Sequence, residues 1–204
     1  MGSGTVRLVE PRPSDSELVA RSLEESTAFE PIFDRHFSAV HVYLHRRAGR
    51  DLADELAAET FALAFSQRAS FRGSGSALPW LYGIATNLLR RQRRKDRRQL
   101  RAYSRSGVDR SVSLEDGAAA RAERSLLDPR LAGALAAMRP RERDALLLYA
   151  LADLSYEEIA FALGVPVGTV RTWLHRARKT AQRELAAAEV SVAPLAVTGV
   201  DPNG

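Results

Sequence analysis

Three histidines are the side chains in this sequence best able to do chemistry together, and they precede a short acidic run. His41 and His45 lie four residues apart, so a helix would place both on one face, with His36 nearby in the sequence. Imidazoles beside the acids at 51–59 could bind a divalent metal. However, no HExxH or HxH frame accompanies them. We therefore expect no metal site and no cofactor, and keep a metal-dependent enzyme as an alternative.

The sequence contains no other motif that is typical of catalysis. Its 204 residues include no Cys, which excludes disulfides, thiol catalysis and thiolate metal sites. It has neither a GxxxxGK[ST] phosphate loop nor a G-x-S-x-G nucleophile elbow. We predict that the chain has no catalytic residues and is not an enzyme.

Charge is distributed very unevenly along the chain, whose net charge is +5. Between Thr86 and Arg101, eight basic residues stand against the single acid Asp96, a local net charge of +7. By contrast, residues 51–59 carry four acids and no base, namely Asp51, Asp54, Glu55 and Glu59. Two oppositely charged surfaces in one half of the chain suggest two different partners.

Apolar spacing predicts helices along most of the chain and gives no convincing strand. Three helices are expected, over 29–47, over 51–66 with acids on its solvent side, and over 79–98 with arginines opposite the apolar face. A Gly/Ser loop at 70–77 precedes Trp80 and Tyr82, of which Tyr82 is expected in the core. These segments form a first compact domain, residues 27–98.

The remaining segments divide the chain further. Residues 99–127 have no sustained apolar face and are predicted to be a flexible linker. Residues 1–26 are expected to be disordered, and 190–204 to be a tail. No apolar run approaches the roughly 20 residues of a membrane span, so we expect a cytoplasmic protein without a membrane partner. The predicted fold class is all-α, with two small helical domains.

The second domain, residues 128–189, has the pattern of a helix-turn-helix. Ser155 and Glu158 form an S-x-x-E capping box that begins one helix. Gly164 can end that helix in a left-handed conformation, and Pro166 prevents its continuation. A second helix is then expected to begin near Val167.

The second helix of this motif has two distinct faces. At about 100° per residue, its apolar residues fall within roughly 60° of Val170, and its donors lie opposite. Arginine on such a face can read guanine in a major groove, while Thr and Lys hold phosphates. The candidate contacts are Thr169, Arg171, Thr172, His175, Arg176 and Lys179. A stand-alone helix-turn-helix regulator that dimerises on a palindrome remains an alternative.

Two blocks of the sequence, in this order and spacing, resemble a known family. The segment "MRPRERDALLLYALADLSYEEIAFALGVPVGTVRTWLHRARKTAQREL" is similar to region 4 of bacterial RNA polymerase sigma factors of the extracytoplasmic-function (ECF) group, within the sigma-70 superfamily. The segments "DLADELAAETFALAF" and "FRGSGSALPWLYGIATNLLRRQRRKDRR" are similar to region 2 of the same group. The resemblance spans residues 28–188.

This resemblance implies a role for each charged surface. Asp54, Glu55 and Glu59 would bind the largest subunit of core RNA polymerase, which the chain would contact together with the second-largest subunit. Single-stranded minus-ten DNA would be bound by Phe71, Trp80, Asn87, Arg90, Arg91 and Arg94. The helix-turn-helix would read the minus-thirty-five duplex, and an anti-sigma factor would hold the protein inactive. The chain would thereby promote strand opening and direct transcription initiation.

The sequence departs from the family pattern at three positions. Ala58 stands where Gln is common, Asp153 where Gly is usual, and Trp173 where Arg is usual. We expect Trp173 to pack against the first helix of the helix-turn-helix rather than to touch DNA. These departures bear on the promoter sequence, not on the class of protein.

Overall fold

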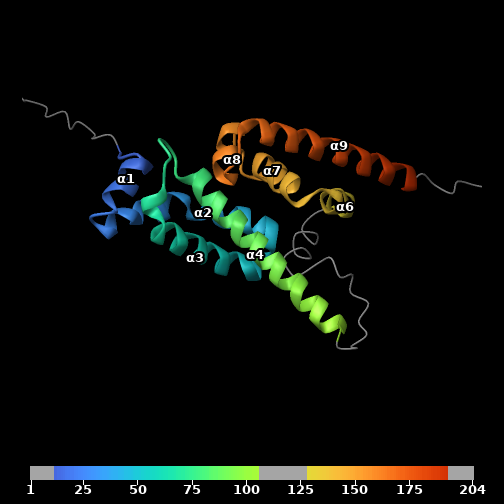
Figure 1. Ribbon diagram of the computed structural model, residues 1–204, viewed down its shortest axis with the longest axis horizontal. Coiled ribbons are helices and arrows are strands. Elements are labelled where there is room, and N and C mark those ends of the chain that lie inside the picture. The colour runs from blue at the N-terminus through green and yellow to red at the C-terminus, as the bar shows by residue number, and fades with distance from the viewer. Residues whose placement is uncertain (1–11, 106–127, 193–204) are drawn as a thin grey trace, which may run out of the picture.

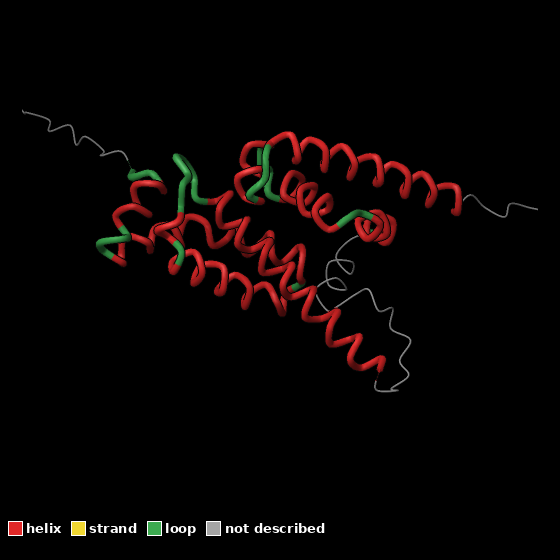
Figure 2. Tube along the Cα trace, in the orientation of Figure 1, coloured by secondary structure: helices red, strands yellow, loops and turns green. Residues whose placement is uncertain are grey.

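The computed structural model describes residues 12–105 and 128–192, and all regular elements within these ranges are helical (Figures 1 and 2). This confirms the predicted all-α fold class. No helix in the described ranges is long and apolar enough to cross a membrane. Residues 106–127 of the linker expected at 99–127, residues 193–204 of the tail expected at 190–204, and residues 1–11 of the expected disordered segment lie outside the described residues.

The first domain is built on three long helices, α2 (Glu30–Ala48), α3 (Arg50–Ser66) and α4 (Leu78–Arg105). Gly49 joins α2 to α3 with φ 78°, a conformation that costs glycine little. Side chains from all three helices make the core, among them Ile32, Leu44 and Leu81, each fully buried. Burying each such side chain stabilises the fold by about 1.5–3 kcal/mol.

The N-terminal segment corrects one prediction. Residues 15–26 are not disordered, because α1 (Asp15–Arg21) and the 3₁₀ helix η1 (Ser26–Phe29) pack onto the first domain. A capping box between Ser14 and Glu17 begins α1, and Leu18 and Val19 bury its apolar side. A second 3₁₀ helix, η2 (Arg68–Ser70), follows α3. The expected linker also begins late, since α4 continues to Arg105.

The second domain contains α6 (Pro129–Ala137), α7 (Pro140–Leu151), α8 (Tyr156–Leu163) and α9 (Val167–Val192). Asp128 caps α6 by accepting a hydrogen bond from the backbone N–H of Arg130 at 2.7 Å. Leu135 and Met138 pack with Leu147 of α7 and Ala177 of α9. The long α9 therefore lies across α6, α7 and α8 (Figure 1).

The two domains pack against each other along α4 and α8. Gly83 of α4 lies so close to α8 that a Cβ atom there would be 2.3 Å from the carbonyl oxygen of Ala162. Buried apolar residues of both domains, such as Leu81 and Ile159, belong to one continuous core. The domains thus form a single packed unit within the described residues.

Candidate nucleic-acid interface

The helix-turn-helix forms as its sequence predicts. The Ser155 hydroxyl accepts from the N–H of Glu158 at 3.2 Å, and the Glu158 carboxylate accepts from the N–H of Ser155 at 2.8 Å. Gly164 ends α8 with φ 64°, in the left-handed region. The N–H of Val165 then bonds the carbonyl of Ala160 at 3.0 Å, and α9 begins two residues later at Val167.

The two faces of α9 separate as expected. Val170, Leu174 and Ala177 are fully buried against the rest of the domain. Of the candidate DNA contacts, Thr169 is half-buried and the others are exposed on the outer side, namely Arg171, Thr172, His175, Arg176 and Lys179. The Arg176 guanidinium lies 4.0 Å from the carboxylate of buried Glu142. The helix therefore presents hydrogen-bond donors to solvent along more than two turns.

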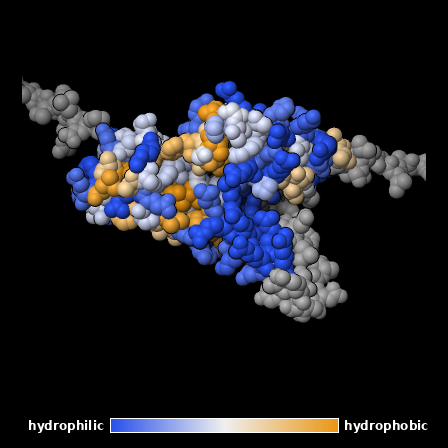
Figure 3. Space-filling view, in the orientation of Figure 1, coloured by the Kyte–Doolittle hydropathy of each residue, from blue (hydrophilic) through white to orange (hydrophobic). Residues whose placement is uncertain are grey.

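A basic surface covers the C-terminal half of α4. Arg91, Arg94, Lys95 and Arg98 line one surface pocket together with Gln99. Figure 3 shows this part of the molecule as a continuous hydrophilic area. The candidate residues Arg91 and Arg94 are exposed there, and Arg91 lies 3.9 Å from Glu59 of α3. Such a surface can attract a phosphate backbone.

The loop that precedes α4 is ordered around an aromatic pair. The rings of Phe71 and Trp80 lie 5.1 Å apart, and both side chains are partly exposed. Gly73 lies against the Phe71 ring, since a Cβ atom there would be 2.4 Å from the ring edge. Asn87 is exposed seven residues beyond Trp80, two helical turns along the same side of α4. Tyr82 is buried in the core, as predicted.

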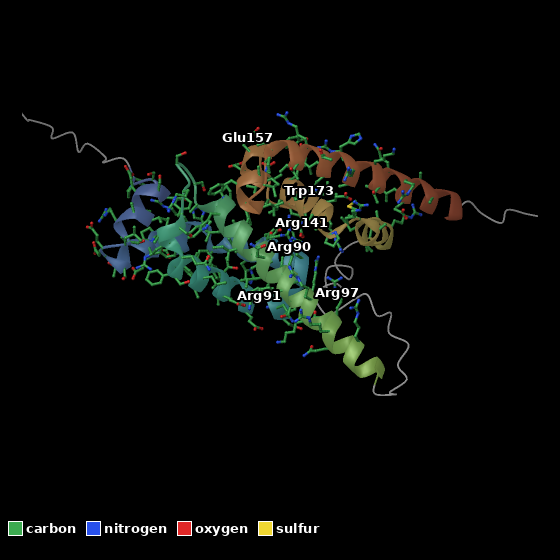
Figure 4. All side chains as sticks on the ribbon, viewed as in Figure 1. Arg90, Arg91, Arg97, Arg141, Glu157 and Trp173 are labelled. Atoms are coloured by element: carbon green, nitrogen blue, oxygen red, sulfur yellow. The ribbon has the colours of Figure 1, made fainter. Side chains whose placement is uncertain are left out.

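Arg90 is not free to contact DNA in this arrangement, because its side chain bonds the other domain. Its Nε donates to the carboxylate of Asp144 at 2.6 Å, across the boundary between the domains (Figure 4). The other oxygen of Asp144 accepts from Arg47 at 2.6 Å, and both residues are buried. Burial raises the pKa of Asp144, but the charges of Arg47 and Arg90 outweigh it and lower the pKa below its ordinary value.

The acidic candidates are exposed on α3. Asp54, Glu55 and Glu59 all lie at the surface, and the Asp54 carboxylate is 2.7 Å from the ring nitrogen of His41. The rings of His41 and His45 stack 6.4 Å apart. No group of three possible metal ligands occurs in the part of the chain that the structure describes. His36 lies apart from this pair and bonds Asp15.

Comparisons with known proteins identify the family. The sigma-70 region 2 model matches residues 32–99 and the sigma-70 region 4 model matches residues 130–180. The chain is 30% identical over 161 residues to RNA polymerase sigma factor YlaC of Bacillus subtilis, covering 76% of this chain and 91% of that protein. The chain belongs to the sigma-70 family, in its ECF group. It is therefore a non-enzymatic protein of transcription initiation.

Two further similarities extend this assignment. The chain is 32% identical over 161 residues to the ECF RNA polymerase sigma factor SigE of Mycolicibacterium smegmatis, covering 78% of this chain and 62% of that one. It also shares its fold with the sigma factor RpoE in a co-crystal structure with the anti-sigma factor NepR from Bartonella quintana. That similarity has a TM-score of 0.56 and 24% identity, and covers 78% of this chain and 98% of that one.

The three departures from the sigma pattern have different structural settings. Ala58 is exposed on α3. Asp153 has φ 52°, the left-handed conformation for which glycine is the usual choice. Trp173 is half-buried, and the Arg141 guanidinium of α7 lies 5.8 Å from its ring centre (Figure 4). This contact is with α7, so the expected packing of Trp173 against α8 stays a prediction.

Sequence reasoning missed the contact between the domains. Arg47 ends an amphipathic helix and Asp144 lies among other charged residues, so neither stands out by its position. They are 97 residues apart in the chain, and no periodicity links them. A charged residue on the predicted buried side of a helix would have been the one sequence signal that such a buried ion pair exists.

Proposed function

We propose that this sigma factor binds core RNA polymerase, recognises the minus-thirty-five and minus-ten promoter elements, and promotes strand opening between them. The single observation that carries the proposal is the separation of surfaces. Acids are exposed on α3, bases on α4, and hydrogen-bond donors on the outer side of α9. Each surface suits a different partner.

The outer side of α9 would read the minus-thirty-five duplex. A helix that follows a tight turn can enter the major groove with its N-terminal residues at the base edges. Arg171 and Arg176 can bond guanine O6 and N7, and each good pair contributes about 1–3 kcal/mol of discrimination. Thr172 and Lys179 would position the helix on phosphates.

The loop and α4 would capture the melted minus-ten strand. Unstacking a base costs a few kcal/mol, and stacking on an aromatic ring offsets about 1–3 kcal/mol of this. Phe71 in the loop and Trp80 in the first turn of α4 provide such rings, and Asn87 adds an amide. Arg91 and Arg94 lie further along the helix, where a single strand could follow their charges.

The acidic side of α3 would bind the polymerase. Asp54 and Glu55 lie about one turn before Glu59, and all three are exposed toward a basic partner surface on the largest subunit. Such a partner would compete with His41 for Asp54 and with Arg91 for Glu59. An anti-sigma factor is the second protein partner that we propose, because the structurally similar RpoE forms a complex with one. Such a partner would compete for the same charged surfaces.

A run-off transcription assay tests this function. Core polymerase and the chain, separately and together, are given genomic promoter fragments that include the region upstream of the chain's own coding sequence. We expect specific transcripts only when both are present, and weak duplex binding by the chain alone. Tight binding to a palindromic duplex without polymerase, and no transcript, would instead favour a stand-alone regulator.

Charge-neutralising variants test whether polymerase binding depends on the acids of α3 or only on the total negative charge of the domain. Replacing three acids together, as Asp54→Asn, Glu55→Gln and Glu59→Gln, should weaken assembly with core polymerase at least tenfold, measured by fluorescence anisotropy. The matched control is Glu24→Gln, Glu25→Gln and Asp34→Asn, which removes equal charge from exposed positions of the same domain. Equal affinities of the two triple variants would contradict the proposed docking surface.

A further inference from the structure

Helix α1 lies outside the matched sigma-70 segments, yet its first residue bonds the loop before α4. Asp15 is 7% exposed, and one of its carboxylate oxygens accepts from the backbone N–H of Ala77 at 2.8 Å. The same oxygen is 2.5 Å from the ring nitrogen of His36, and the other accepts from Arg35 at 2.9 Å. One buried carboxylate therefore joins α1, α2 and the start of α4.

The other end of the loop is also fastened to the α1 segment. Arg68 of η2 donates from Nε to the carbonyl of Ser22, the residue after α1, at 3.1 Å. Its guanidinium stacks 4.0 Å from the ring centre of Phe65 and bonds the carbonyl of that residue. Residues 71–76 thus run between two anchor points on the same N-terminal segment.

The hydrogen bonds made by the side chains of Arg72 and Ser76 within the loop are local and cannot replace these anchors. The Arg72 side chain bonds the carbonyls of Ala69 and Phe71, and the Ser76 hydroxyl accepts from the N–H of Leu78. These contacts shape single turns of the loop but do not fix it to the domain. The Asp15 bond does so at Ala77, three residues before Trp80.

The charge of Asp15 suits this role. Burial raises the pKa of its carboxyl group, but the hydrogen bonds from Ala77, His36 and Arg35 lower it below its ordinary value overall. The group is therefore an anion at neutral pH, which strengthens its hydrogen bonds. An anion at the start of α4 is also favoured by the dipole of that long helix.

We infer that Asp15 is a positioning residue for the minus-ten recognition loop, holding residues 71–77 and the Phe71–Trp80 pair in the conformation that receives single-stranded DNA. This inference rests on the proposed function of that loop. The loop ends at a fixed backbone N–H, so the two aromatic rings keep one mutual position. Without this anchor, binding DNA would have to order the loop first, which costs free energy.

The test compares Asp15→Asn with Glu17→Gln. An Asn keeps the size of the side chain but loses the charge and meets three donors with one acceptor. Glu17 lies on the same helix and bonds Ser14 rather than the loop, so its variant controls for damage to α1. Hydrogen exchange of the free chain is measured over 71–80 and, for comparison, over α3. Transcription with core polymerase is measured on a duplex promoter that the wild type uses.

We expect Asp15→Asn to speed exchange over 71–80 at least tenfold, leaving α3 unchanged. Transcription should fall about tenfold or more, as expected for the loss of a buried, charge-assisted hydrogen bond. Binding to core polymerase and sensitivity to minus-thirty-five substitutions should stay within about twofold of wild type. If Asp15→Asn does not fold, His36→Ala should show the same selective changes to a smaller degree.

Two results would overturn the inference and can be told apart. Unchanged exchange over 71–80 in a folded variant would show that Asp15 does not hold the loop, whatever the promoter function. Faster exchange with wild-type levels of transcription would show that the anchor does not matter for promoter recognition. A wild-type chain that supports no transcription, while exchange still depends on Asp15, would overturn the proposed function and with it the promoter role of Asp15.

Discussion

At the residue scale, a single carboxylate links the two halves of the molecule. Asp144 accepts hydrogen bonds from Arg47 and Arg90, and only Arg90 is partly exposed. Breaking a buried ion pair by removing one partner costs about 3–5 kcal/mol when the other charge stays buried. Arg47 also donates to the Tyr43 hydroxyl of its own helix at 2.6 Å, and we expect separation of the domains to relieve the remaining cost by admitting water to the guanidinium.

We therefore predict that Asp144→Asn separates the domains without unfolding them. The chain has no Cys, so cysteines introduced at exposed Glu24 and Arg183 can carry a fluorescent pair. Energy transfer should fall in Asp144→Asn, while helicity by circular dichroism stays unchanged. Asp54→Asn, which removes an exposed carboxylate bonded to His41, is the control. An unchanged transfer efficiency in the Asp144 variant would contradict the link.

Asp153 provides a second prediction at this scale. A non-glycine residue in the left-handed region costs up to about 1–2 kcal/mol, less for Asp than for most others. Asp153→Gly should therefore stabilise the folded chain. The gain should be smaller than the strain that is relieved, because glycine also increases the conformational freedom of the unfolded state. Thermal unfolding should show a higher midpoint for Asp153→Gly. The comparison variant Ala150→Gly, exposed in the last turn of α7, should show a lower one. A lower midpoint for Asp153→Gly would mean that its side chain stabilises the turn.

At the element scale, the turn of the helix-turn-helix depends on Gly164. Gly164→Ala meets no atom within 4 Å, so its cost is backbone strain of about 1–2 kcal/mol. Gly168→Ala also meets no atom, but it lies within α9 and should gain up to about 1 kcal/mol. Opposite shifts in the unfolding midpoint are expected for these two variants. Shifts of the same sign would show that the left-handed backbone conformation at residue 164 does not require glycine.

Most helices were predictable because their sequences carry strong local signals. The expected helices at 29–47 and 51–66 differ from α2 and α3 by one residue at some ends. The capping box at Ser155 and the glycine at 164 defined the turn directly. The faces of α9 followed from period alone, because its apolar residues are spaced for one buried side.

Other elements were not predictable from local pattern. Helix α1 has seven residues and few apolar ones, so its order depends on burial of Leu18 and on the Asp15 bonds to distant residues. The end of α4 at Arg105 lies in a polar stretch without an apolar face. The pairing of Arg90 with Asp144 depends on a contact between domains that no local spacing encodes.

At the scale of the whole molecule, the contact between domains competes with proposed DNA contacts. The Nε of Arg90 bonds Asp144, and the Phe71 ring lies 6.4 Å from that of Phe161 on α8. A phosphate at this nitrogen of Arg90 would have to displace Asp144. A minus-ten strand that used this nitrogen of Arg90, as the family resemblance implies, would therefore be incompatible with the packed arrangement.

Gly83→Ala tests this competition without removing a charge. The new methyl group would lie 2.3 Å from the backbone oxygen of Ala162, so α4 and α8 could not approach as closely. Helix α4 itself should gain stability, because alanine favours helices. We expect the same fluorescent pair to report separation, and single-stranded minus-ten DNA to bind more tightly. The control is Gly133→Ala, whose Cβ would meet no atom within 4 Å and which should change neither the energy transfer nor the DNA binding. Energy transfer that stays at the wild-type level in Gly83→Ala would contradict the proposed competition.

The central claim, that each domain reads its own promoter element, is tested most directly by crossing protein variants with promoter variants in run-off transcription. The protein variant is Arg171→Ala with Arg176→Ala, and Arg178→Ala with Arg183→Ala removes equal charge from the same helix as a control. A minus-thirty-five substitution should lower wild-type and control transcription about tenfold. The Arg171/Arg176 variant should respond little to that substitution yet respond to minus-ten substitutions as the wild type does. Equal sensitivity of all three proteins to the minus-thirty-five substitution would contradict the claim.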